Sequence, residues 1–258
     1  MRVVTWNVNS LKARMPRVLE LLAQHEPDVV CLQETKANRD AFPDLELQDA
    51  GYQAVHESGG RWAGVAILAK RSIELADPAY HLPGDPVPEE ARWCEATADG
   101  IRFASVYVPN GRTLDSPEYP RKLKFLDAMI ERATELRDGA TPLFVCGDMN
   151  IAPADEDVYD PPAFVGGTHV SEPERTRLTA LLHQGDLLDA YRTLHPDEVQ
   201  YTWWDYRAGN FHKGLGLRID LALISRSIGE RLVAVGIYRD YRKGKKPSDH
   251  APLAVDLK

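Results

Sequence analysis

Short apolar runs rich in β-forming residues recur along the chain, separated by polar segments that contain Gly, Pro, Asn or Asp. Runs of this length and composition predict β-strands, several of them buried on both faces. The Asp99-Gly100 pair between two alternating runs predicts a tight hairpin. The predicted strands are residues 2–6, 28–32, 52–57, 64–70, 94–98, 101–108, 143–146, 218–224, 232–238 and 251–257.

Three segments carry a helical pattern instead. The first has Pro16, which we place in the first turn of a helix because that turn leaves its N–H groups unbonded, and Pro27 closes it. The other two are residues 117–137 and 175–184. Strands outnumber helices, so the pattern predicts an α/β domain with a large core of sheet. The predicted surface loops, rich in Pro, Asp and Gly, are residues 76–90 and 152–168.

The segment 142–150 is the most informative single stretch. Its apolar residues predict a buried strand over 143–146, and Gly147 is expected to break that strand by a change of backbone direction. Asp148 and Asn150 follow two positions apart, and in extended chain such residues point to the same side. The pair would place a carboxylate and a carboxamide at one spot, although a turn or capping role is the ordinary alternative.

The composition is typical of a soluble globular protein, since 43% of the 258 residues are hydrophobic and 27% are charged. No apolar run approaches the roughly 18 residues of a membrane-spanning helix, and the N-terminus does not resemble a signal peptide. The cysteines Cys31, Cys94 and Cys146 are scattered, which favours buried thiols in a reducing cytoplasm over disulfides. We therefore expect a cytoplasmic protein that does not bind membranes.

The net charge of −8 argues against a nucleic-acid partner at first sight, because phosphates are neutralised by Lys and Arg. An enzyme that holds a divalent cation with carboxylates is acidic at its centre, however, and its basic contacts are local. The distribution of charge therefore decides more than its sum.

Polar residues gather at the ends of the predicted strands. Each has an ordinary explanation, such as a turn, a surface ion pair or an aromatic with a wet hydroxyl group. Together they suit metal-dependent hydrolysis of a phosphodiester, because a hard cation takes oxygen ligands and polarises a phosphate. The set is Asn7, Glu34, Tyr107, Asp148, Asn150, Asp220, Asp249 and His250.

In this interpretation Glu34 and Asp249, with Asn7, supply the metal's oxygen ligands. Asp148, held by Asn150, orients and deprotonates the attacking water. A cationic His250 donates a hydrogen bond to a phosphoryl oxygen, with Asp220 fixing its tautomer. Tyr107 hydrogen-bonds the same phosphate.

Seven segments, in their order along the chain, resemble the exonuclease III branch of the endonuclease/exonuclease/phosphatase superfamily. One tetrapeptide of this kind is weak evidence, whereas seven in order are specific. The resemblance covers nearly the whole chain, with Met149 standing where Phe is more usual. The segments are Thr5–Asn9, Leu32–Lys36, Tyr107–Gly111, Gly147–Asn150, Thr202–Tyr206, Leu217–Asp220 and Ser248–His250.

The resemblance implies one catalytic domain over residues 1–258 with a four-layer α/β sandwich fold, in which two packed mixed β-sheets are flanked by helices. It implies hydrolysis of duplex DNA on the 5′ side of abasic sites, together with 3′-end processing by exonuclease or 3′-phosphatase action. Mg²⁺ is the expected cofactor, with Mn²⁺ as an alternative. Whether one or two metals act stays open, and Asp148 and Asn150 are the alternative metal ligands.

DNA would be held mainly through its backbone. Trp203 is preferred over Trp204 as the aromatic that lines a pocket for a flipped-out abasic sugar. A solvated face is the ordinary alternative for the basic run over residues 239–246. The predicted substrate contacts are Arg61, Asn110, Trp203, Lys213, Lys243, Lys245 and Lys246.

Two other functions stay open. The same superfamily contains phosphatases and phosphodiesterases that act on substrates other than DNA, and a catalytically inactive DNA-binding module is a further alternative. The filled acidic positions argue against the inactive module. We expect a monomer that acts on duplex DNA with abasic sites or 3′ ends, as nucleoid DNA in a bacterial-type cytoplasm would present.

Overall fold

Two six-stranded β-sheets pack face to face in the computed structural model, which describes all residues from 1 to 258. The strand order is β11-β12-β1-β2-β4-β3 in the first sheet and β5-β6-β7-β8-β10-β9 in the second. The first sheet contains β1 (Arg2–Asn7), β2 (Val29–Gln33), β3 (Tyr52–Glu57), β4 (Val65–Lys70), β11 (Leu232–Ile237) and β12 (Leu253–Leu257). The second contains β5 (Ala76–Tyr80), β6 (Trp93–Ala98), β7 (Ile101–Tyr107), β8 (Leu143–Asp148), β9 (Leu187–Asp189) and β10 (Asp220–Ser225).

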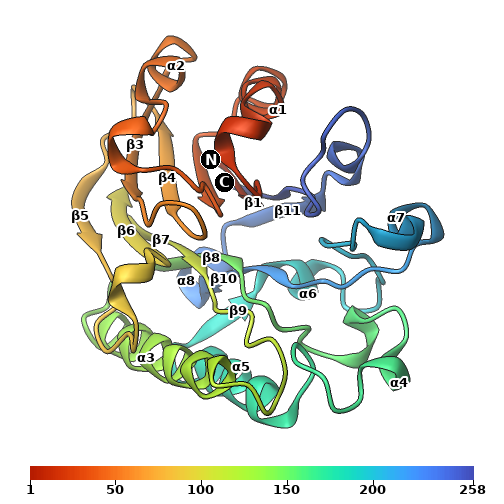
Figure 1. Cartoon of the computed structure of the whole chain (residues 1–258). Helices are drawn as coiled ribbons and strands as arrows, with labels where there is room; N and C mark the ends of the chain where they lie inside the picture. Colours follow the sequence, from red (N-terminus) through yellow and green to blue (C-terminus); the bar gives the residue numbers. More distant parts are fainter.

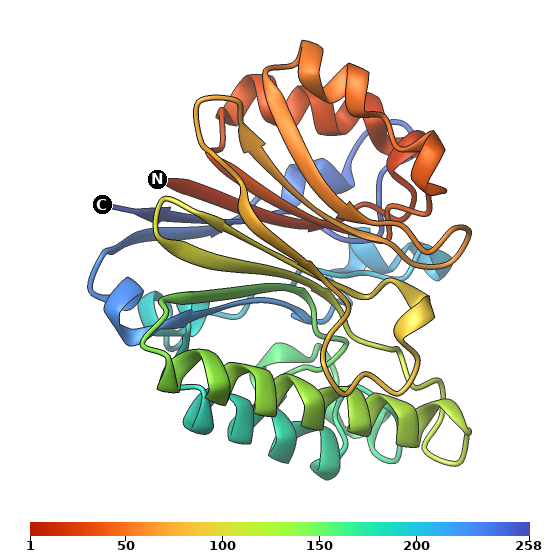
Figure 2. The same cartoon turned by 90° about the vertical axis from the view of Figure 1, so that its left-hand side faces the viewer.

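Helices cover the outer faces of both sheets, which gives the four-layer α/β sandwich visible edge-on in Figure 2. On the first sheet lie α1 (Leu11–His25) and α2 (Asp44–Asp49), and on the second lie α3 (Glu118–Asp138) and α5 (Glu172–Gln184) (Figure 1). Both sheets are mixed, because β1–β2 and β7–β8 pair in parallel while the other pairs are antiparallel. Short helices occupy the loops: α4 (Pro161–Phe164), α6 (Ala190–Leu194), α7 (Asn210–Lys213) and α8 (Arg226–Gly229).

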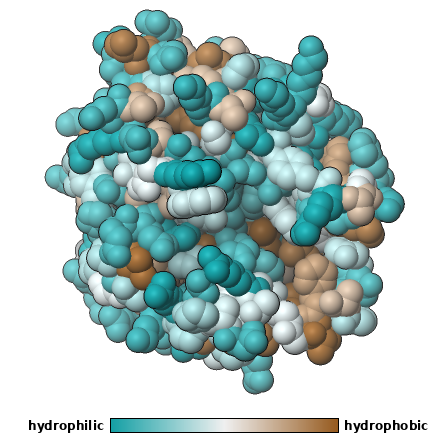
Figure 3. Space-filling view, in the orientation of Figure 1, coloured by the Kyte–Doolittle hydropathy of each residue, from teal (hydrophilic) through white to brown (hydrophobic).

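Three apolar layers hold the sandwich together. The inter-sheet layer contains all three cysteines, each a free buried thiol, beside Phe103 and Phe144. The other layers lie between each sheet and its helices. Strands such as β4 and β8 are thus buried on both faces, which explains why they appear in the sequence as continuous apolar runs. The face shown in Figure 3 is mainly hydrophilic. None of the helices is both long and apolar enough to cross a bilayer.

Two predicted elements need correction. Pro16 lies inside α1, not in its first turn, because the helix begins five residues earlier, where Ser10 accepts a hydrogen bond from the backbone N–H of Ala13 at 3.4 Å. The segment 76–90 is not wholly a loop, since β5 occupies its first part. That strand is a partly exposed edge strand with a bulge and contains proline, so it lacks the apolar run of a central strand. The short elements β9, α2, α4, α6, α7 and α8 were not predicted.

Gly147 continues strand β8 instead of breaking it. Its φ is +146°, and a Cβ atom there would lie 2.0 Å from the carbonyl oxygen of Val106 on the neighbouring strand. The glycine is needed because β7 and β8 approach closely at this position, and the strand therefore carries Asp148 straight to the sheet edge.

We expect Gly147→Ala to lower the free energy of unfolding by at least about 1 kcal/mol, because the added methyl group meets backbone that cannot move cheaply. Urea denaturation measures the change. Gly236→Ala in β11 is the matched control, since nothing lies within 4 Å of its added Cβ. Equal stabilities of the two variants would contradict this account of Gly147.

Candidate active site

The register of three neighbouring strands sets Tyr107, Asp148 and Asp220 in one row across the second sheet. Tyr107 ends β7 and lies opposite Asp148, which ends β8. Asp148 in turn lies opposite Asp220, the first residue of β10. Paired residues on adjacent strands project to the same face, so residues far apart in sequence become neighbours.

The first sheet brings the other polar residues to the same edge. Glu34 directly follows β2, and Asp249 and His250 lie just before β12, separated from it by Ala251 and Pro252. Together the two sheets enclose a cavity of about 170 Å³. It is lined by Glu34, Tyr107, Asn110, Asp148, Asn150, His169, Trp203, Ile219, Asp249 and His250. Glu34, Asp148 and His250, which lie far apart in the sequence, therefore converge on one cavity, as the interpretation of the polar strand ends as one hydrolytic site requires.

His250 is buried between two carboxylates. Its Nδ1 lies 2.8 Å from Oδ2 of Asp220, and its Nε2 lies 3.7 Å from Oδ2 of Asp148. Burial disfavours the charged imidazolium, but the charges of Asp220 and Asp148 outweigh it and raise the pKa of His250 to about 10. At neutral pH the ring is a cation with an N–H on each nitrogen: Nδ1 donates to Asp220, and Nε2 makes no hydrogen bond within the protein and can donate to a substrate oxygen.

Asp148 is held by two hydrogen bonds. Its Oδ1 accepts from the backbone N–H of Asn150 at 2.9 Å, and its Oδ2 accepts from Nδ2 of Asn7 at 2.9 Å. Burial raises its pKa to about 7, helped by the negative charges of Asp220 and Glu34 and opposed by His250. The carboxyl group therefore lies in a fixed position at the floor of the cavity.

The phenol of Tyr107 stays protonated. Its burial, together with the charges of Glu34 and Asp148, raises its pKa well above the usual value, although the Arg92 guanidinium opposes the shift. A neutral hydroxyl group in this cavity is a hydrogen-bond donor for an anionic oxygen.

Asn7 does not present its oxygen as expected for a metal ligand. It is fully buried, and its amide nitrogen donates to Oε1 of Glu34 at 2.8 Å as well as to Asp148. Its oxygen accepts from the backbone N–H of Asn9 at 3.0 Å. Two facing carboxylates require a donor between them, so Asn7 positions these carboxylates from behind the cavity wall.

Oxygen donors suited to a hard cation remain. Glu34, Asp148 and His250 have ligand atoms within 4.8 Å of one another, and Asp249 lines the same cavity. A cationic His250 is no ligand, so carboxylate oxygens make up the donor set, which favours Mg²⁺ or Mn²⁺ over softer metals. Asp249 was expected to offer its carboxylate to the metal, but both of its oxygens already accept hydrogen bonds. Asn9 donates to one at 3.0 Å and Trp203 to the other at 3.1 Å.

The predicted DNA contacts fall into two groups. Asn110 and Trp203 line the cavity, whereas Trp204 is buried, as expected for one of two adjacent tryptophans. The basic run near residues 239–246 is not uniformly solvated, because Arg242 is buried and donates to the backbone oxygens of Ser248 and Trp204. The exposed cations outside the cavity are Arg61, Lys213, Lys243, Lys245 and Lys246.

Two residues of the site, Lys36 and His169, were not predicted. Lys36 places its ammonium group 2.7 Å from Oε2 of Glu34 and donates to Asn9. His169 lines the cavity from a long loop, and its Nδ1 lies 2.6 Å from the backbone oxygen of Asn150. Lys36 lies within the motif Leu32–Lys36 and could have been predicted from it. The sequence around His169 contains no motif that predicts a position in the active site.

Comparison with known proteins decides the family. A family model described as the Endonuclease/Exonuclease/phosphatase family matches residues 4–250. The chain belongs to this family, in its exonuclease III branch. An exodeoxyribonuclease III from Haemophilus influenzae is 30% identical over 272 residues, covering 100% of both chains. An exodeoxyribonuclease from Bacillus subtilis is 31% identical and covers 99% of this chain and 98% of its own.

Solved structures of this branch have the same architecture. A 3′ phosphatase from Neisseria, bound to a product DNA hairpin, is 38% identical with a TM-score of 0.97, and the match covers 100% of this chain and 99% of that one. An AP endonuclease from Archaeoglobus fulgidus is 33% identical with a TM-score of 0.95, over 100% and 99% of the two chains. The four-layer sandwich predicted from the resemblance is confirmed.

Proposed function

We propose that this protein is a metal-dependent DNA-repair phosphodiesterase that hydrolyses phosphoesters at the 3′ ends of duplex DNA and on the 5′ side of abasic sites. The observation that carries the proposal is the convergence of Glu34, Asp148 and the Asp220–His250 pair on one small polar cavity. The similarity to a 3′ phosphatase and to an AP endonuclease supports both substrate classes.

The carboxylates of Glu34 and Asp249, with Asp148 or Asn150 as alternatives, would hold the cation. Bound Mg²⁺ or Mn²⁺ supplies positive charge that polarises the phosphate and stabilises the leaving oxygen. Asn7 donates to Oε1 of Glu34 and Lys36 pairs with its Oε2, so a bound cation would share this carboxylate with the Lys36 ammonium group.

Each remaining residue acts on the substrate or the water. Asp148 accepts a proton from the attacking water and keeps its orientation through the hydrogen bonds from Asn7 and Asn150. His250 and Tyr107 donate hydrogen bonds to phosphoryl oxygens, where negative charge grows in the transition state. Because these donors are fixed before substrate arrives, little reorganisation is needed at the moment of reaction.

The proposed backbone contacts lie outside the cavity. Arg61, Lys213 and the lysines of the 243–246 segment are exposed, and Lys243 is partly neutralised by Asp240 at 2.6 Å. Contacts of this kind carry no base specificity, which suits an enzyme that acts on damage at any sequence. We propose that the protein acts as a monomer, because one chain contains the whole constellation.

The proposal is tested with three duplexes that carry a 3′-phosphate, a recessed 3′ end or an internal abasic analogue, each with Mg²⁺ or with EDTA. Hydrolysis that requires the metal is expected on at least one 3′-end substrate and on the abasic duplex. A soluble phosphomonoester serves as the comparison. Faster hydrolysis of that compound than of any DNA would favour the non-DNA alternative, and binding without hydrolysis would favour the inactive module.

We expect Glu34→Gln to lower the affinity for the metal by about 10- to 100-fold, because the variant loses a charged oxygen ligand. Isothermal titration calorimetry with Mn²⁺ measures this affinity as a dissociation constant, without any substrate. Glu57→Gln, at the end of β3 and outside the cavity, is the control. An unchanged dissociation constant for Mn²⁺ in Glu34→Gln would remove Glu34 from the metal site.

A further inference from the structure

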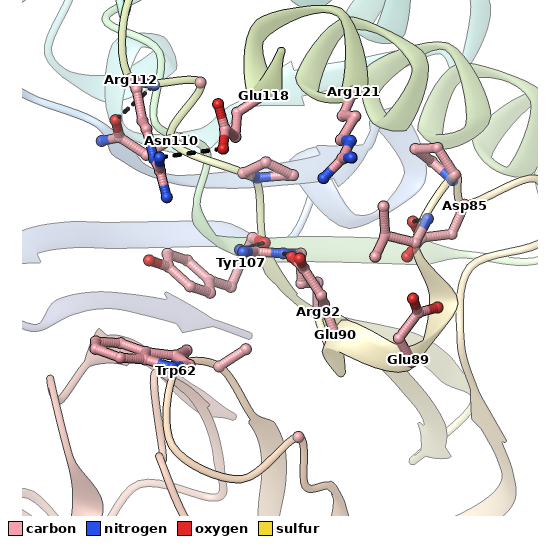
Figure 4. A pocket seen from close by; sticks show the side chains of 16 residues that line it. Trp62, Asp85, Glu89, Glu90, Arg92, Tyr107, Asn110, Arg112, Glu118 and Arg121 are labelled. Carbon is pink, nitrogen blue, oxygen red and sulfur yellow. Dashed lines mark hydrogen bonds and ion pairs between the residues drawn. The ribbon is translucent and has the colours of Figure 1, made fainter. Parts of the chain in front are cut away.

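A second hollow adjoins the catalytic cavity and has no role in the mechanism above. Its volume is about 460 Å³, and it shares Tyr107 and Asn110 with that cavity. Figure 4 shows its walls, with Trp62 on one side, the segment that contains Asp85 and Glu89 on another, and Arg121 of α3 opposite. A substrate group next to the scissile phosphate therefore lies within reach of this groove.

The lip of the groove is an exposed aromatic. Trp62 is 71% exposed, which is unusual for so large an apolar side chain. The Arg61 guanidinium lies 5.1 Å from the centre of its ring, and inside the groove Arg92 lies 4.7 Å from the ring of Tyr107. Exposed tryptophan beside arginine is the kind of platform on which bases stack in proteins that bind single strands.

The charges of the groove do not suit a phosphate. Its carboxylates are Asp85, Glu89, Glu90 and Glu118, and its guanidiniums are Arg92, Arg112 and Arg121. Two of the cations are already paired, Arg92 with Glu90 at 2.6 Å and Arg112 with Glu118 at 3.1 Å. Carboxylates repel phosphodiesters, but they accept hydrogen bonds from the amino groups of bases.

We propose that this groove receives an unpaired nucleobase of the DNA substrate, stacked on Trp62, beside the nucleotide whose phosphate occupies the catalytic cavity. The inference rests on the proposed function. A hollow of this volume is typical of a small-ligand site, and its mixture of one aromatic platform with both signs of charge matches the flat face and polar edges of a base. The enzyme thereby recognises a frayed or mismatched terminus through the base as well as through the phosphate.

The test measures binding in an Asp148→Asn background, so that the substrate is not consumed. Two duplexes differ only in the last nucleotide of the 3′ strand, which is paired in one and mismatched in the other. We expect Trp62→Ala to weaken binding of the mismatched duplex by between about 5- and 150-fold, the range of one lost base stack. Binding of the paired duplex should change by less than about twofold, and Trp62→Phe should keep most of the affinity.

A third duplex, with an abasic analogue in place of the unpaired nucleotide, completes the comparison. On this duplex Trp62→Ala should have no effect, because the base that stacks on the ring is gone. Equal losses on all three duplexes would overturn the proposal in favour of a backbone contact, and no loss on any would exclude Trp62 from DNA binding. Because binding is measured without turnover, this result stands or falls separately from the hydrolytic assay of the wild-type protein.

Discussion

Replacing Asp148 with Asn is expected to lower kcat on a 3′-phosphate duplex by about 10²- to 10⁴-fold while leaving DNA affinity within about threefold. The carboxyl group is the only part of the residue that changes, and it is held in place by Asn7 and by the backbone of Asn150. Asparagine keeps the shape but cannot accept the proton of the attacking water. The loss therefore falls on the chemical step: steady-state kinetics measures kcat, and single-turnover kinetics separates the rate of that step from DNA binding.

The matched control makes the same Asp-to-Asn substitution at a position outside the active site. Asp99→Asn lies in the exposed β6–β7 hairpin at a φ of +49°, a conformation that asparagine tolerates well. We expect this variant to retain wild-type kcat and KM. If Asp148→Asn also hydrolysed abasic or 3′-phosphate DNA at the wild-type rate, the assignment of Asp148 as the base would be wrong.

The sequence predicted much of this arrangement because the strands of a sandwich carry a strong apolar signal. Strands β4 and β8 are buried on both faces, and their apolar runs are recognisable without tertiary information. Asp148 comes one residue after the apolar run of β8, and His250 comes just before the run that forms β12, so their place at a sheet edge is also local information. Their closeness to one another was inferred from seven ordered motifs, since spacing alone does not pair the strands.

Features that depend on neighbours were lost or misread. Nothing local shows that Asn7 faces two carboxylates, and the amide therefore looked like an oxygen ligand. Arg242 belonged to a basic run for which DNA contacts were predicted, although it is buried and donates to the backbone oxygen of Trp204. Gly147 was interpreted as the end of a strand. Glycine is needed there because the carbonyl group of Val106 on the adjacent strand leaves no room for a Cβ atom. Each error concerns an interaction between segments distant in sequence.

A buried ion pair beneath the active-site loops leads to the second large prediction. Lys122 of α3 and Glu174 of α5 form a salt bridge in which both side chains are fully buried. The Lys122 ammonium group also donates to the backbone oxygens of Asn110 at 3.2 Å and Asn150 at 2.8 Å. One cation thus fixes two loops that line the catalytic cavity to the two outer helices.

We expect Lys122→Met to lower the free energy of unfolding by about 3–5 kcal/mol at pH 7, because it leaves Glu174 charged and buried without its partner. Lys124→Met, an exposed position on the same helix, should change it by less than about 0.5 kcal/mol. The double variant Lys122→Met with Glu174→Gln removes both charges and should recover most of the loss. Urea denaturation measures all three.

The pH dependence separates a lost charge partner from a mere packing defect. Burial alone would raise the pKa of Glu174, but the charge and hydrogen bond of Lys122 outweigh it and hold that pKa below 4.5. In the wild type this carboxylate therefore stabilises the fold above pH 4.5, and the contribution is lost as the pH falls below it. In Lys122→Met the main interaction that lowers the pKa of Glu174 is missing, so burial raises this pKa. Protonation of Glu174 as the pH falls then removes the unpaired buried charge and its cost to stability. The stability difference between the two proteins should then shrink as the pH is lowered from 7 toward 4, whereas a packing defect would leave it constant.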